Sequence, residues 1–138
     1  MSTPDDVARA SAERMWTADT ASRDLGMRIE EVRVGYARLS MTLAPRMAQG
    51  HGTAHGGFVF ALADSAFAFA CNSYGPTTVA ASCDITYLRP GVVGDELVAE
   101  AVERERYGRN GIYDVSVRRV SDGVVIAEFR GKSRTIGR

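Results

Sequence analysis

The amino-acid sequence predicts an α+β fold in which one long buried helix is wrapped by an antiparallel sheet of five to six strands. The helix is indicated by residues 58–73, which contain five alanines and are apolar on nearly every side. The sheet is indicated by four consecutive strand-like segments after residue 77, because such a run favours antiparallel pairing. The 138 residues fit one domain, 1–138, which is long enough to bury a hydrophobic core.

The first half of the chain supplies a short helix, two strands and a loop. Residues 5–18 mix apolar residues with charges and predict a short amphipathic helix within an N-terminal segment, residues 1–24. Strands are expected at 27–34 and 36–43, since apolar and polar residues alternate in the second of them. Residues 45–57 then form a loop that leads into the buried helix.

Turn residues divide the second half of the chain into strands. Gly75-Pro76 ends the buried helix. Glycine-containing turns then separate four strands, which we expect at residues 77–88, 96–106, 111–120 and 123–135. No second helix of similar length is expected to cover the other face of the sheet. An exposed sheet edge or face therefore suggests association with another copy of the chain.

Composition excludes several classes of protein. Basic and acidic residues balance at 17 each, so no general attraction to nucleic acid or to an anionic membrane is expected. Cys71 and Cys83 lie in apolar sequence and predict buried free thiols. The N-terminus lacks an apolar signal region, and Asp64 interrupts the longest apolar stretch. We therefore expect a cytoplasmic protein with no membrane segment.

The chemistry is predicted to lie where His55-Gly56-Gly57 enters the buried helix. The first turn of a helix has free backbone N–H groups at the positive end of the macrodipole, and glycine lets a ligand approach them closely. Such a helix start can hold a developing oxyanion. Farther along the same helix, the carboxylate of Asp64 is costly to bury unless it is paired or functional.

Spacing along the helix makes a further prediction. Gly56 and Asp64 are eight residues apart, so one helix separates them by about 12 Å. Catalytic contacts are about 3 Å long, so the two residues cannot act on the same carbonyl from one helix. Two antiparallel copies of the helix across a two-fold axis would bring Gly56 of one subunit near Asp64 of the other. A dimer with two equivalent sites is therefore expected.

These residues resemble a known family. Residues 50–57, GHGTAHGG, and 61–73, ALADSAFAFACNS, are similar to the hotdog-fold thioesterases, particularly the phenylacetic-acid-degradation thioesterases. The stretch Tyr87-Leu88-Arg89-Pro90-Gly91 adds to a likeness that covers the chain from about Leu25 onward. The resemblance implies a hotdog fold, hydrolysis of acyl-CoA thioesters to free acid and CoA, and dimers that pair into tetramers. No cofactor is implied beyond the coenzyme A of the substrate.

The resemblance also implies roles for four residues. Asp64 matches the acidic residue that attacks the thioester or activates water, and Gly56 matches the glycine whose N–H polarises the carbonyl. His55 occupies the position of a histidine that supports the loop. Gln49 stands where the family commonly has Asn, one methylene shorter with the same amide chemistry.

Substrate contacts are expected around this centre. Arg89 and the turn at 108–110 match places where the family touches CoA, and an arginine suits phosphate. Aromatic residues beside Asp64 make an aryl acyl group plausible, with hydroxylated aryl and medium-chain groups left open. The expected substrate-binding residues are Gly57, Phe60, Phe67, Ala68, Arg89, Pro90, Gly108, Arg109 and Asn110.

Other chemistries fit less well. His51 and His55 lie on a loop without a Cys-x-x-Cys pair, so no metal site is expected. No Gly-x-Ser-x-Gly elbow is present. Two alternatives stay open: a non-catalytic acyl-CoA-binding hotdog module, which would not need the carboxylate, and a hotdog hydratase or dehydratase, which pairs histidine and acid in another pattern.

Overall fold

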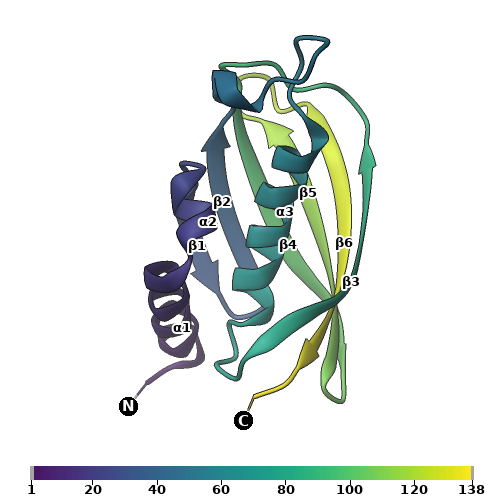
Figure 1. The fold of residues 1–138 in the computed structure, drawn as a ribbon. Helices are drawn as coiled ribbons and strands as arrows, with labels where there is room; N and C mark the ends of the chain where they lie inside the picture. The colour runs from purple at the N-terminus through teal and green to yellow at the C-terminus, as the bar shows by residue number, and fades with distance from the viewer. Residues whose placement is uncertain (1, 138) are drawn as a thin grey trace.

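The order of helices and strands follows the sequence prediction closely. In the computed structural model, which describes residues 2–137, they are α1 Pro4–Ala18, α2 Thr20–Asp24, β1 Arg28–Arg33, β2 Tyr36–Thr42, the 3-10 helix η1 Pro45–Met47, α3 Gly56–Cys71, β3 Thr78–Tyr87, β4 Glu96–Tyr107, β5 Asn110–Arg119 and β6 Val125–Thr135. α3 lies in front of the sheet, and α1 and α2 lie at the β1 edge (Figure 1). This arrangement confirms the predicted α+β architecture.

The strands form a single six-stranded sheet in the order β1-β2-β4-β5-β6-β3, with every neighbouring pair antiparallel. Two strands are therefore edges. β1 is flanked by α1, whereas no other element within residues 2–137 lies along the free side of β3 (Figure 1). The sheet thus presents one covered edge and one open edge.

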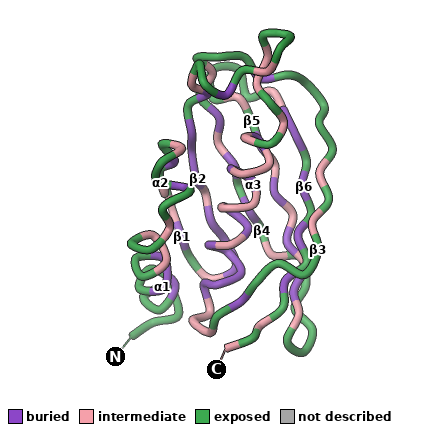
Figure 2. The backbone as a smooth tube through the Cα atoms, in the orientation of Figure 1, coloured by how far each residue is buried: buried purple, intermediate pink, exposed green. Residues whose placement is uncertain are grey.

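Alternation along the strands separates a buried face from a polar face. On β5, Tyr113 and Val115 are buried against α3, while Asp114 and Ser116 point to the opposite face. Figure 2 shows the same alternation of buried and exposed residues along the central strands. Because α3 lies on the apolar face, the opposite face of the sheet is left to charged and polar side chains.

The centre of the core lies where α3 crosses β5 and β6. Phe67 is almost fully buried, and its ring packs against Tyr113 and Phe129 with centroids 5.7 Å and 5.8 Å away. Gly131 lies beneath the same ring, and a Cβ atom at this position would come within 2.7 Å of Phe67. The close packing of helix on sheet therefore depends on a strand residue without a side chain.

Substituting Gly131 by alanine is expected to destabilise the fold by about 1–3 kcal/mol. The Phe67 ring packs against Phe129 and cannot move away from the added carbon freely. Urea unfolding of the two proteins measures the difference. Gly50→Ala is the matched control, since a Cβ there meets nothing within 4 Å. Equal stability of the Gly131 and Gly50 variants would contradict this packing argument.

The N-terminal segment is anchored on α3 as well as on β1. α1 begins with a capping box between Thr3 and Asp6 and a proline in its first turn. Ser11 donates a 2.8 Å hydrogen bond to the carbonyl of Asn72 at the end of α3, and Trp16 packs against Phe69 with centroids 6.2 Å apart. The predicted N-terminal helical segment is thus two helices, α1 and α2, fixed to the central helix.

The bounds of the buried helix and the structure of the loop before it differ from the sequence prediction. The pattern predicts the buried helix over 58–73, but α3 begins at Gly56 and ends at Cys71. Glycine is a poor helix former, which hides the true start, whereas capping by His55 makes the start possible. The expected loop 45–57 contains η1 and a short bridge between Ala48 and Ala54. No helix within residues 2–137 is both long and apolar enough to cross a bilayer.

Candidate active site

The start of α3 presents an unoccupied backbone donor. His55 is the N-cap, and its Nδ1 accepts a 3.0 Å hydrogen bond from the N–H of Gly57. Gly56 is the first helical residue, and its own N–H donates to no acceptor within residues 2–137. A free donor at the positive end of a 16-residue helix is the arrangement expected of an oxyanion site.

Replacing His55 by alanine is expected to cost about 1 kcal/mol of stability, because the Gly57 N–H loses its acceptor. His55→Asn should keep most of this stability, since an asparagine side chain can accept the same hydrogen bond. Urea unfolding of the three proteins distinguishes the outcomes. If the alanine and asparagine variants were equally stable, the capping role of His55 would be wrong.

Strand β3 reaches the helix start through a tyrosine. The Tyr87 hydroxyl donates a 2.9 Å hydrogen bond to the carbonyl of Gly56. A Cβ atom on Gly56 would lie 2.9 Å from the Tyr87 ring, so this ring would have to shift if residue 56 carried a side chain. Sequence reasoning gave Tyr87 no role, although it begins the stretch that resembles the family.

A cleft of about 460 Å³ opens beside Gly56 and Tyr87. Arg89 and Pro90 line it, as does the loop residue Ala54. The Arg89 guanidinium donates a 2.8 Å hydrogen bond to the carbonyl of Val125, which holds it at the edge of β6. The structure therefore brings three of the expected residues, Gly56, Arg89 and Pro90, into one cavity.

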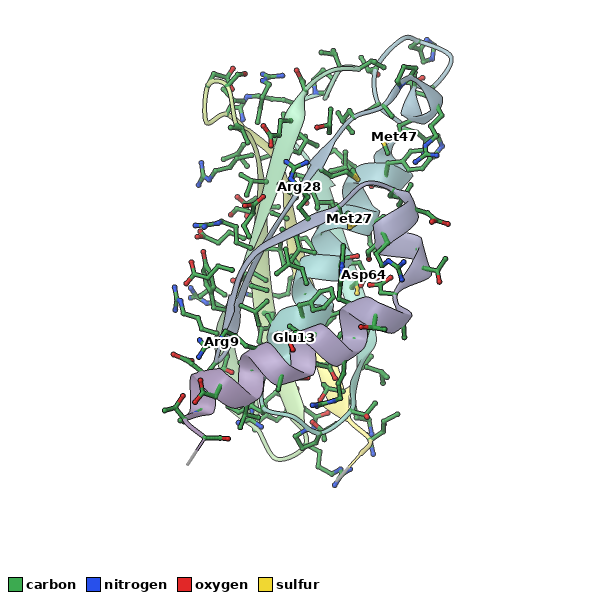
Figure 3. All side chains as sticks on the ribbon, turned by 90° about the vertical axis from the view of Figure 1, so that its left-hand side faces the viewer. Arg9, Glu13, Met27, Arg28, Met47 and Asp64 are labelled. Carbon is green, nitrogen blue, oxygen red and sulfur yellow. The ribbon has the colours of Figure 1, made fainter. Side chains whose placement is uncertain are left out.

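Asp64 lies near the middle of α3, where α1 gives way to α2 (Figure 3). Its carboxyl is half-buried and receives no hydrogen bond from any residue within 2–137. Burial raises the pKa of the Asp64 carboxyl above its usual range, and the nearby carboxylate of Asp19 raises it further. An unpaired, desolvated carboxyl of this kind is a strong candidate for a base or a nucleophile.

The exposed side of α3 is a stripe of small residues around Asp64. Helical spacing puts its members on one face, where none is fully buried in the single chain: Gly57, Ala61, Asp64, Ser65 and Ala68. Gly56 and Asp64 belong to the same unbroken helix, so about 12 Å of helix axis separates them. The single chain therefore does not bring the free donor and the carboxyl together.

Other expected residues have structural partners within the chain. The Gln49 side chain is used in its own loop, where it donates to the Thr53 hydroxyl at 2.7 Å and accepts from the N–H of His51 at 2.9 Å. Phe60 stacks edge-on against Phe129 with centroids 5.4 Å apart. Phe67 lies in the centre of the core, as described above, so the structure gives it a packing role.

The turn at 108–110 lies at the far end of the sheet from Gly56. Asn110 pairs with Arg134 at that end, whereas Tyr87, beside Gly56, pairs with Ala127 at the other (Figure 1). The Arg109 guanidinium donates to the carbonyls of Thr135 and Gly137 at 3.0 Å and 3.3 Å. Within one chain, this turn cannot share a ligand with Arg89.

Comparison with known proteins decides the family. Residues 51–126 match the thioesterase superfamily, and the chain is 42% identical over 127 residues to acyl-coenzyme A thioesterase PaaI of Escherichia coli (strain K12), covering 92% of this chain and 90% of that protein. The chain belongs to the thioesterase superfamily. The hotdog fold and the thioesterase likeness predicted from the sequence are thereby confirmed.

Solved structures agree. The E. coli PaaI protein from the phenylacetic acid degradation operon superposes with a TM-score of 0.95 at 40% identity, covering 98% of this chain and 97% of that one. A variant of phenylacetic acid degradation protein PaaI from Thermus thermophilus superposes with a TM-score of 0.80 at 38% identity, covering 83% and 97%. The N-terminal helices are therefore shared with the E. coli thioesterase structure almost in full.

Within residues 2–137, no three histidine, cysteine or acidic side chains gather to form a metal site. Both cysteines are free thiols, and burial raises the pKa of Cys71 to about 12.

Proposed function

We propose that this protein is an acyl-CoA thioesterase that hydrolyses aryl or medium-chain acyl-CoA to the free acid and coenzyme A. The observation that carries the proposal is a free Gly56 N–H at a helix start, inside a cleft, on the same helix as the unpaired Asp64 carboxyl. The first can stabilise the oxyanion of a tetrahedral intermediate, and the second can attack the thioester or activate water. Kinship with acyl-coenzyme A thioesterase PaaI supports the same reaction.

The active unit is a dimer in this proposal, because the two groups are too far apart on one helix. β3 is a ten-residue edge strand with exposed apolar residues at both ends, Val79 at 42% and Tyr87 at 49% exposure. Long unprotected edges favour pairing with another chain. Antiparallel pairing of two β3 strands would place the exposed stripes of two α3 helices face to face in opposite directions.

Each active site then draws on both subunits. Gly56 of one subunit polarises the thioester carbonyl, and Asp64 of the partner subunit approaches the same carbon. Water supplies the oxygen of the free acid, and the thiolate of CoA leaves and takes up a proton. The same two-fold axis brings residues 108–110 of one subunit to the end of the sheet where the partner's Arg89 lies. Arginines from both subunits can then bind the phosphates of CoA. We further propose that two such dimers associate into a tetramer and that the protein is cytoplasmic.

A hydrolysis panel tests the proposed function. Phenylacetyl-CoA, a ring-hydroxylated phenylacetyl-CoA and hexanoyl-CoA are incubated with the protein, and released thiol is followed with a chromogenic disulfide. We expect kcat/KM of at least about 10⁴ M⁻¹ s⁻¹ for one class of substrate. Tight binding of all three esters without thiol release would instead favour a non-catalytic acyl-CoA-binding module. Hydration of an enoyl-CoA without thiol release would favour a hydratase.

A further inference from the structure

The junction between α1 and α2 carries a carboxylate that the sequence did not single out. Asp19 ends α1 and is the N-cap of α2, where its carboxylate accepts two hydrogen bonds from Ser22, one from the N–H at 2.9 Å and one from the hydroxyl at 2.7 Å. Asp19 is partly buried and Ser22 is buried, in a segment otherwise exposed to solvent. The side chains of this junction therefore point inwards, towards α3.

A chain of hydroxyl groups joins this junction to the catalytic helix. The hydroxyls of Ser22 and Ser65 lie 2.8 Å apart. Because the Ser22 hydroxyl donates its hydrogen to Asp19, the Ser65 hydroxyl must donate to Ser22. Ser65 is the residue next to Asp64, yet its hydroxyl hydrogen is used in the bond to Ser22 and not in a bond to that carboxyl. These hydrogen bonds hold Asp19 beside Asp64, and they leave the Asp64 carboxyl without a hydrogen-bond donor.

The position of Asp19 is rigid because the N-terminal segment is anchored on both sides of it. The contacts of Ser11 and Trp16 with the C-terminal half of α3 hold α1, and the Ser22–Ser65 bond holds α2. Figure 3 shows Asp64 on α3 at the level of this junction. A like charge held at a fixed place in a partly desolvated site acts strongly on its neighbour.

We propose that Asp19, held by Ser22 and Ser65, is a positioning residue that controls the protonation of Asp64 during thioester hydrolysis. The inference rests on the proposed function, in which Asp64 is the catalytic carboxyl. Asp19 need not touch the substrate. Its negative charge favours uptake of a proton by Asp64, which makes the ionised Asp64 a stronger base or nucleophile than an ordinary aspartate.

The other groups near Asp64 do not oppose this effect. Cys71 on α3 and Cys83 on β3 both lie close enough for Asp64 to act on them. Burial raises the pKa of each thiol, and the charge of Asp64 raises it further, so both stay neutral at neutral pH. Within residues 2–137, Asp19 is the only charged group that shifts the pKa of Asp64.

Carbon-13 NMR titration of the Asp64 carboxyl in the full-length protein tests the proposal without reference to activity. In Asp19→Asn, which keeps an N-cap for α2, the Asp64 midpoint should move to lower pH. Ser22→Ala should move it the same way but less, because Asp19 loses the hydroxyl donor of Ser22 and keeps only its backbone N–H. Asp24→Asn, the same change at the exposed end of α2, should leave the midpoint where it is. An Asp64 midpoint that is identical in wild type and Asp19→Asn would overturn the proposal.

The pH profile of kcat/KM separates failure of this inference from failure of the proposed function. If Asp64 is catalytic, the acidic limb in Asp19→Asn shifts with the NMR midpoint, and activity at low pH rises several-fold relative to the plateau. A midpoint that moves while the acidic limb stays in place would support the control of Asp64 by Asp19 and contradict the catalytic role of Asp64.

Discussion

Replacing Asp64 by asparagine is expected to lower kcat/KM for the best acyl-CoA substrate by about 10²- to 10⁴-fold. Asparagine has nearly the same shape as aspartate but can neither take up a proton nor attack a thioester. The position is half-buried and receives no hydrogen bond from residues 2–137, so the amide displaces no partner. Binding of the CoA ester should persist, which calorimetry with the inactive variant would show.

The same substitution should raise the stability of the fold at neutral pH. Because the pKa of Asp64 is raised in the folded protein, the folded state binds the proton more tightly than the unfolded state. The contribution of this tighter proton binding to folding stability is fully present below pH 3.8, the ordinary aspartate pKa. It is lost as the pH rises through the pKa of Asp64 in the folded protein. Asp64→Asn should therefore melt at a higher temperature than wild type at neutral pH. The difference in melting temperature should shrink as the pH falls towards 3.8.

Thermal melts and thiol-release assays on the same preparations check both effects, with Asp24→Asn as the control for losing an exposed aspartate. Lower activity with higher stability is typical of a residue kept for function at a cost to folding. Full turnover in Asp64→Asn would remove its assigned role. Lower stability at neutral pH would show that Asp64 has a partner in the assembled protein.

Gly56→Pro is expected to lower kcat/KM by about 10²- to 10³-fold, because proline has no N–H to stabilise the oxyanion. Gly56 is the first residue of α3, a position that proline accepts readily, and His55 before it is already extended, with ψ of 131°. Gly56→Ala is the matched control, since it keeps the N–H while adding the carbon that meets Tyr87. An alanine variant as inactive as the proline variant would assign the loss to crowding by Tyr87.

Mixing the two inactive variants tests the shared site directly. Asp64→Asn and Gly56→Pro subunits, carrying different affinity tags, are co-expressed, and heterodimers are purified over both tags. One of the two sites in each heterodimer then combines an intact Gly56 with an intact Asp64. We expect about half of the wild-type activity per dimer. Heterodimers as inactive as either parent would show that each site lies within one subunit.

Much of the fold could be predicted because strand and helix patterns are local. Alternation of apolar and polar residues over 36–43 correctly predicted the strand β2, whose Leu39 and Met41 are buried. The start of α3 was predicted less well, because the helix contains two glycines and depends on the His55 cap. Register shifts, such as the one between Ala80 and Ser82 on β3, have no signal in the alternation of residue types.

Some residues of the candidate site could be predicted from the sequence and others could not. Gly56 and Asp64 could be found from the sequence, since a glycine before a helix and a carboxyl within an apolar helix are both unusual. Phe67 and Gln49 could not be placed, because the sequence does not show that Phe67 packs on Gly131 or that Gln49 binds within its own loop. Aromatic residues at helical spacing are more often core than ligand wall.

The sequence by itself determined the α+β architecture, the donor-rich helix start and the acidic residue on the same helix, because each depends on neighbours within a few residues. Only the tertiary structure decided that β3 is an open edge, that Tyr87 covers Gly56, and that Asp19 reaches the surroundings of Asp64 through serines 43 residues apart. Such contacts join distant parts of the chain, and they form only when the helices and strands pack together.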